Sequence, residues 1–142
     1  MIHLRQATPD DALTVAQLHI AGWRDGYADL LPSSFLESLD IRQRTENWKK
    51  HLGNGSIVWI ATYNTAPAGV VSFGPPLNPI PHPNPHELSA CGEITMIYTL
   101  EQFYRLGVGT ALFRHACDCL KREGYTRIYL WVLEDNKKGR AF

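Results

Sequence analysis

The stretch from Glu93 to Leu133 constrains the fold of this chain more than any other part of it. Residues 93–99 have the composition of a strand, and Gly107 then opens a helix whose apolar residues recur at helical spacing. Residues 127–133 are apolar at nearly every position, which is typical of a strand covered on both faces. A strand, a crossover helix and a second strand predict a parallel pair, so we expect an α/β domain with a mixed sheet.

The beginning of the chain predicts a strand followed by an amphipathic helix. Residues 2–6 alternate as in a strand, and Thr8 and Pro9 then provide the cap and the first position of a helix. Five residues of this helix recur at helical spacing and predict one buried stripe: Leu13, Ala16, Ile20, Trp23 and Tyr27.

The middle of the chain predicts a second helical segment, a hairpin and a long loop. The helical segment begins at Leu31-Pro32-Ser33 and extends to His51, and antiparallel strands follow at 56–63 and 68–73. Residues 74–85 hold six of the nine prolines, which excludes a helix or a central strand there. The predicted order is therefore β-α-α-β-β-β-α-β, in a single domain over residues 1–142.

Charge and cysteine content exclude several classes of function. The 14 basic and 14 acidic residues give zero formal net charge, whereas binding to nucleic-acid phosphates requires a positive surplus. Cys91, Cys117 and Cys119 include no CxxC pair, so we expect reduced thiols, no metal site and a cytoplasmic protein. The longest apolar run, Ile57 to Ala61, is far shorter than the ~20 residues that span a bilayer. We therefore expect neither a nucleic-acid nor a membrane partner.

Two glycines at the predicted helix start, Gly107 and Gly109, point to the binding of phosphates. The first N–H groups of a helix have no acceptor within it, and the helix dipole adds partial positive charge there. Glycine removes side chains that would hold a phosphate away from this backbone, and Arg105 adds a cation. Alone, the pair fits close packing of a helix on a strand equally well. It completes neither a Rossmann fingerprint nor a P-loop, because the third glycine and the Gly-Lys-Ser/Thr sequence are lacking.

Taken with other segments in order, these glycines resemble the GNAT superfamily of N-acetyltransferases. The similarity covers nearly the whole chain, and its joint occurrence in order is specific although each piece alone is not. It is carried by Gly22-Trp23-Arg24, Ser72-Phe73-Gly74, Gly92-Glu93-Ile94, Gly107-Val108-Gly109-Thr110-Ala111-Leu112 and Leu130-Trp131-Val132-Leu133-Glu134-Asp135-Asn136. The resemblance implies a GNAT-like fold that lacks the usual last helix and two strands.

The resemblance also implies a binding site for acetyl-CoA as co-substrate. In this family the fourth and fifth strands splay apart around the pantetheine arm, and the pyrophosphate sits on the loop that opens the next helix. Carried over to this sequence, the cofactor-binding residues are Ile97, Tyr98, Thr99, Tyr104, Arg105, Leu106, Gly107, Val108, Gly109, Thr110 and Asn136. Tyr104 and Leu106 depart from the family's usual Gln or Arg and Arg or Lys. Because backbone N–H groups make most of the pyrophosphate contacts, we still expect binding. A turn former is the alternative for Asn136.

Glu93 is the candidate general base. An amine is mostly protonated at neutral pH and must lose a proton before it attacks a thioester, which a nearby carboxylate accepts directly or through a water. The alternative for Glu93 is a solvated strand residue without a catalytic part. The Tyr that protonates the leaving thiolate in this family would lie past Phe142, so Tyr98 or Tyr104 is the candidate donor.

Trp23 and Tyr27 are candidates for the wall of the acceptor pocket, with packing in the core as the alternative. We predict an enzyme that transfers an acetyl group from acetyl-CoA to a primary amine, on a small molecule or a peptide, by direct attack in a ternary complex. A non-catalytic acyl-CoA-binding or regulatory module of the same fold is the alternative, favoured by Tyr104, Leu106 and the missing Tyr.

The predicted strand at 127–133 would leave an apolar edge at the end of the sheet. Family members continue with a helix and two strands, one of which covers this edge. Since bare apolar edges promote aggregation, we expect the edge to be covered by a second copy of the chain, or by residues removed in a truncated form.

Overall fold

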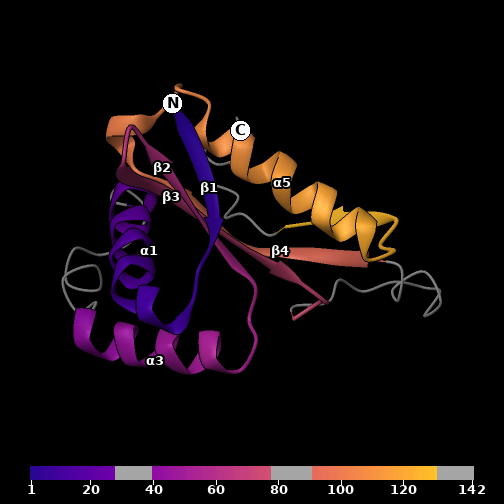
Figure 1. Cartoon of the computed structure of the whole chain (residues 1–142), viewed down its shortest axis with the longest axis horizontal. Helices are drawn as coiled ribbons and strands as arrows, with labels where there is room; N and C mark the ends of the chain where they lie inside the picture. Colours follow the sequence, from indigo (N-terminus) through magenta and orange to yellow (C-terminus); the bar gives the residue numbers. More distant parts are fainter. Residues whose placement is uncertain (28–39, 78–90, 131–142) are drawn as a thin grey trace.

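The computed structural model describes residues 1–27, 40–77 and 91–130 (Figure 1). The elements in chain order are β1 (Ile2–Gln6), a 3₁₀ turn (Pro9–Asp11), α1 (Ala12–Tyr27), α3 (Ile41–Gly53), β2 (Val58–Tyr63), β3 (Ala66–Gly74), β4 (Cys91–Thr99), a second 3₁₀ turn (Glu101–Phe103), α5 (Val108–Arg122) and β5 (Arg127–Tyr129). Apart from the two short turns, this is the predicted order of helices and strands. The predicted helix start at Leu31 and the parts of the proline-rich loop and last strand beyond Leu77 and Leu130 lie outside the described residues.

The strands form one mixed sheet in the order β1-β2-β3-β4-β5. The pairs β1–β2, β2–β3 and β3–β4 are antiparallel, and β4 and β5 are parallel. Cys91 pairs with Arg127, and Glu93 pairs with Tyr129. The parallel pair joined by α5 confirms the prediction for this part of the chain.

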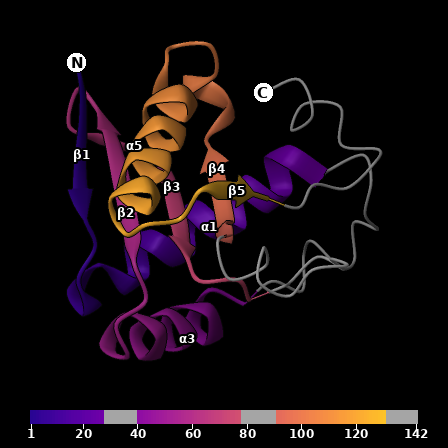
Figure 2. The same cartoon turned by 90° about the vertical axis from the view of Figure 1, so that its right-hand side faces the viewer.

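Helices cover the two faces of the sheet, with α1 and α3 on one face and α5 on the other (Figures 1 and 2). The cluster on the α1 face includes Val15, Leu18, Leu52, Val58, Ile60, Val70 and Met96. The cluster on the α5 face includes Val71, Phe73, Ile94 and the predicted stripe of α5, Val108, Leu112, Ala116 and Leu120. Burial of that stripe confirms the predicted helical spacing, and the helix begins directly after Gly107, as predicted.

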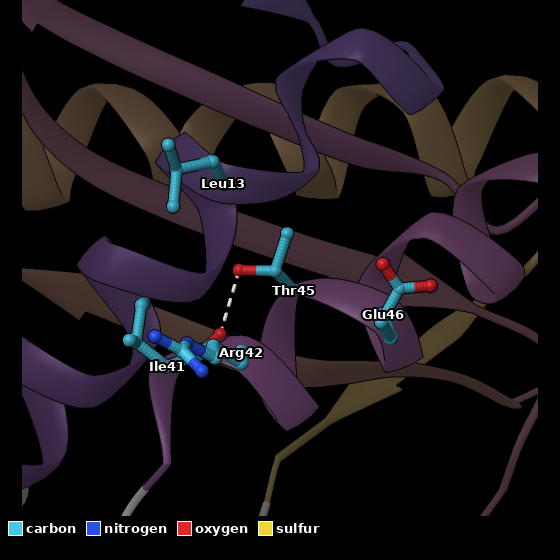
Figure 3. Close-up of a pocket in the computed structure, with 5 residues that line it drawn as sticks. All are labelled: Leu13, Ile41, Arg42, Thr45 and Glu46. Atoms are coloured by element: carbon cyan, nitrogen blue, oxygen red, sulfur yellow. Dashed lines mark hydrogen bonds between the residues drawn. The ribbon is translucent and has the colours of Figure 1, made fainter.

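The predicted stripe of α1 is wrong at Leu13, which is 51% exposed. The buried face of the helix starts one position earlier, at Ala12, and continues through Val15 and Ala16. Because successive residues are about 100° apart around a helix, Leu13 turns away from the sheet. It lines an open surface pocket with four residues at the start of α3, namely Ile41, Arg42, Thr45 and Glu46 (Figure 3).

The described part of the last strand differs from the prediction at Leu130 and in cover, and residues 131–133 lie outside the described residues. β5 contains Arg127, Ile128 and Tyr129, and Leu130 follows it outside the strand and 37% exposed. Ile128 packs against the α5-face cluster, whereas Arg127 is exposed. The described part of this strand is therefore half-buried rather than enclosed, because it pairs with β4 on one side at the end of the described sheet.

Candidate active site

Glu93 lies on β4 where the described pairing with β5 ends, and its side chain is 1% exposed. Its Oε1 accepts a hydrogen bond from the backbone N–H of Leu77 at 2.9 Å and another from the Tyr129 hydroxyl at 3.3 Å. Pro75 and Pro76 have no N–H, so Leu77 is the first residue after β3 that can donate one. Glu93 is therefore not solvated, and its role as general base stays a prediction.

A β-bulge at Thr95 decides which side chains share a face with Glu93. Ile94 and Met96 pair with consecutive residues of β3, so Thr95 is an extra residue in β4. Ile94 packs in the α5-face cluster, whereas Met96 and Tyr98 pack on the α1 face. Side chains of neighbouring strand residues alternate, so Glu93, next to Ile94, points to the α1 face. The bulge thus puts two candidate catalytic residues, five positions apart, on one face, where a regular strand would separate them.

Tyr98 is held tightly between β4 and α1. Its ring stacks on the imidazole of His19 with centroids 5.6 Å apart and planes inclined by 22°. The helix comes so close that a Cβ atom added to Gly22 would lie 2.5 Å from Cγ of Tyr98. This contact fixes the ring, and the role of Tyr98 as proton donor stays a prediction.

His19 gathers three aromatic side chains from α1, α3 and β4. The indole N–H of Trp23 points at Nε2 at 2.9 Å, and that of Trp48 points at Nδ1 at 3.2 Å. A neutral imidazole has one acceptor nitrogen, so the two contacts cannot both be full hydrogen bonds in one tautomer. Burial, and then the positive charge of Arg44, lowers the pKa of His19 to about 4. The ring is therefore neutral near pH 7.

Trp23, predicted in the acceptor pocket, thus belongs to this aromatic group and is half-buried. Tyr27 is the last residue of α1, and its side chain lies outside the described part of the structure. The sequence analysis missed His19, although His19 and Trp23 stand four residues apart on one helix face.

The loop predicted to bind pyrophosphate leads from the second 3₁₀ turn into α5. Gly107 is the N-cap, with φ 90° in the left-handed region that favours glycine, and Arg105 also has a positive φ of 63°. Arg105, Leu106, Gly107 and Thr110 are exposed, and Tyr104 is half-buried.

Two other predicted cofactor residues face inward. Val108 is 1% exposed, so its side chain belongs to the core and only its backbone can meet a ligand. Ile97 packs against the α5-face cluster and is half-buried. Asn136 lies outside the described residues.

Tyr129, beside Glu93, is another residue that the sequence analysis missed. It occupies the third position of β5, as Glu93 occupies the third position of β4, and the parallel register brings the two together. No signal in the sequence indicated this register, because the predicted strand began at Glu93 whereas β4 begins at Cys91.

Further features of the described residues bear on metals, thiols and membranes. Within 1–27, 40–77 and 91–130, no three His, Cys, Asp or Glu residues come close enough to hold a metal ion. Cys91, Cys117 and Cys119 form no disulfide with one another, and burial raises the pKa of Cys117 and Cys119. Over the same ranges, no helix has the length and apolar character that crossing a membrane requires.

The chain belongs to the Acetyltransferase (GNAT) family, whose sequence profile matches residues 20–142. It is 29% identical over 137 residues to the "Uncharacterized N-acetyltransferase YuaI" of Bacillus subtilis, covering 96% of this chain and 74% of that protein. It is also 29% identical over 144 residues to the "Probable N-acetyltransferase Rv2775" of Mycobacterium tuberculosis, covering 99% and 76%.

A solved structure confirms the GNAT-like fold. PaiA N-acetyltransferase from Thermoplasma acidophilum, crystallised with coenzyme A, superposes with a TM-score of 0.76 over 100% of this chain and 86% of that one. The two sequences are 18% identical, so this likeness shows the fold alone.

Proposed function

We propose that this protein transfers an acetyl group from acetyl-CoA to a primary amine, by direct attack in a ternary complex. Membership of the family supports the reaction class, and coenzyme A is bound in the related PaiA structure. The observation that carries the proposal is Glu93. A carboxylate that is 1% exposed is costly to bury, and two hydrogen-bond donors offset only part of that cost, so its place inside the sheet supports a functional role.

The start of α5 is the proposed seat of the pyrophosphate. Gly107 has no side chain to cap the helix, so the first N–H groups of α5 are left to solvent or a ligand. Exposed Arg105 adds a positive charge beside them, and Thr110 adds a hydroxyl. The pantetheine arm would lie along Ile97 to Thr99, beyond the residues of β4 that pair with β5.

Glu93 is the proposed base and Tyr98 the proposed donor to the leaving thiolate. Loss of a proton leaves the amine nitrogen with the lone pair that attacks the thioester carbonyl. A backbone N–H of β4 would stabilise the negative charge that develops on the carbonyl oxygen. Both side chains project from the same face of β4, so the proposed base and the proposed donor lie on the same side of the sheet.

The remaining expectations are proposals of the same kind. Trp23, in the aromatic group around His19, would form part of the acceptor wall together with Tyr27. We also propose a cytoplasmic location, and a second copy of the chain on the edge of the sheet at β5.

Glu93→Gln tests the proposal because it keeps the shape of the side chain and removes its basicity. We expect the rate with the best acceptor from a panel of amines to fall by roughly 10²–10⁴-fold, with unchanged acetyl-CoA affinity. Product should be measured by mass spectrometry, because free thiols at Cys117 and Cys119 interfere with thiol reagents. Glu46→Gln, at an exposed position of α3, is the matched control and should retain full rate. Acetyl-CoA binding without turnover in the unmodified protein would support a binding module instead.

A further inference from the structure

Glu93 and Tyr129 form a pair in which one member is enclosed and the other is not. Glu93 is 1% exposed, whereas Tyr129 is only half-buried. The hydroxyl of Tyr129 lies 3.3 Å from Oε1 of Glu93, and adjacent parallel strands in register hold both backbones. The carboxylate of Glu93 is therefore enclosed, and an acceptor amine does not reach its oxygen directly.

We propose that the Tyr129 hydroxyl is the relay through which the proton of the acceptor amine reaches Glu93. This inference rests on the proposed function and adds a catalytic residue to it. A tyrosine hydroxyl is suited to the task because it carries one donor hydrogen and accepts at the same oxygen. With its hydrogen directed at Glu93, its lone pairs are directed away from the carboxylate.

The relay transfers one net proton from the amine to Glu93 in two coupled proton transfers, and Tyr129 is neutral before and after. One N–H bond of the protonated amine breaks, and its proton binds the hydroxyl oxygen of Tyr129 as the original hydroxyl proton moves to Oε1 of Glu93. Glu93 becomes a neutral carboxylic acid, Tyr129 stays neutral, and the amine nitrogen keeps the electron pair for attack. After product leaves, the same path in reverse returns the proton to solvent.

The surroundings keep Tyr129 in the neutral form that the relay needs. Burial raises the pKa of Tyr129, and the negative charge of Glu93 and its hydrogen bond raise it further. Cys91, two residues before Glu93 on β4, acts in the same direction. The phenol therefore remains protonated throughout the neutral range, because its ordinary pKa is already about 10.

Tyr129→Phe removes the hydroxyl and keeps the ring. We expect the rate at pH 7 to fall roughly 10²-fold without a change in the KM for acetyl-CoA, as for a lost proton-transfer group. The variant then depends on amine that has lost its proton in solution, so its rate should rise by up to about tenfold per pH unit between pH 6 and 9. The wild-type rate should rise less steeply over this range. Tyr125→Phe, whose ring lies beside Gly92 near the α5-face cluster, is the matched control and should follow the wild-type profile.

A second readout needs no activity. In protein labelled with ¹³C at the tyrosine Cζ atoms, the titration of Tyr129 should shift to lower pH in Glu93→Gln, because the neighbouring negative charge is gone. An unchanged titration, or a ratio of wild-type to Tyr129→Phe rates that is constant with pH, would overturn the relay.

The two proposals fail in different ways. If Glu93→Gln is slow and Tyr129→Phe is not, the relay is wrong and the base stands. If Glu93→Gln keeps full rate, Glu93 is not the base and the relay falls with it, whereas acetyl transfer stands. If the wild type acetylates no amine, the proposed function itself is wrong.

Discussion

The two faces of the sheet are specialised in different ways. On the α5 face the side chains form an apolar cluster, and the part with a proposed function is the backbone at the helix start. On the α1 face, Glu93, Tyr98 and His19 bring carboxylate, phenol and imidazole groups against the sheet. A site made of backbone N–H groups tolerates changes of neighbouring side chains, whereas a site made of side chains depends on how closely they fit. The three predictions below probe this difference.

The close fit of the α1 face can be broken at Gly22. A Cβ atom there would lie 2.5–2.8 Å from three atoms of Tyr98, so Gly22→Ala must shift α1 or the ring. We expect a loss of about 2 kcal/mol in the free energy of unfolding, which outweighs the gain of about 1 kcal/mol from replacing a helical glycine. Denaturant unfolding measures the change. Gly53→Ala is the control, since nothing lies within 4 Å of its added Cβ, and a loss of equal size there would contradict the explanation.

The backbone site should respond to charge rather than to shape. Gly107 is a poor place to test it, because any other residue is strained at a φ of 90°. Thr110 is exposed in the first turn of α5, where a glutamate favours the helix. Thr110→Glu should therefore keep the fold and lower acetyl-CoA affinity about tenfold, or about 1.4 kcal/mol.

Calorimetric titration with acetyl-CoA at low salt measures this affinity. Thr110→Gln introduces a side chain of nearly the same shape as that of Thr110→Glu but without the charge, so it should keep most of the acetyl-CoA affinity. The difference in affinity between the two variants should shrink at high salt. Equal binding by both variants at low salt would show that the phosphates lie elsewhere.

The smallest effect we expect is a pH dependence of stability from His19. Its pKa falls from an ordinary 6.5 to about 4 on folding, so between these values the unfolded chain binds the extra proton. The contribution of His19 to the free energy of unfolding is therefore highest above pH 6.5, where His19 is neutral in both states, and it decreases as the pH falls towards 4. We expect His19 to contribute on the order of 1 kcal/mol to the difference in unfolding free energy between pH 6.5 and 4.5.

His19→Gln should remove this contribution and flatten the curve in that window. Asp11 titrates lower, since the hydrogen bond from Arg5 brings its pKa to about 2, so the two residues are separable. An unchanged slope in His19→Gln would mean that another group titrates there.

Much of the fold was predictable because it depends on local periodicity. The stripe of α5 and the parallel pair it joins follow from spacing within the helix and from the apolar run at Arg127. The start of α5 at Gly107 was equally accessible, and the binding of phosphates there stays a proposal. Leu13 was misplaced because one residue of helix phase decides burial, and that phase is set by packing on the sheet.

The side-chain site was only half predictable because it depends on contacts between distant segments. Glu93 was identified on its strand, but its donors come from residues 16 and 36 positions away. Tyr129 and Trp48 enter the site through strand register and helix packing, which neither composition nor spacing specifies. Regular alternation would place Glu93 and Tyr98 on opposite faces, so the sequence could not predict that the bulge puts them on the same face.

The bulge at Thr95 has a consequence for how relatives of this chain should be aligned. A relative that lacks the extra residue would match this strand only with a gap. If the gap is placed before Glu93, Glu93 is aligned with a residue of the relative whose side chain points to the opposite face of the sheet. Placed at Thr95, it keeps structurally equivalent positions together on both sides. Comparisons of evolutionary rates along β4 are therefore meaningful only with the insertion at 95.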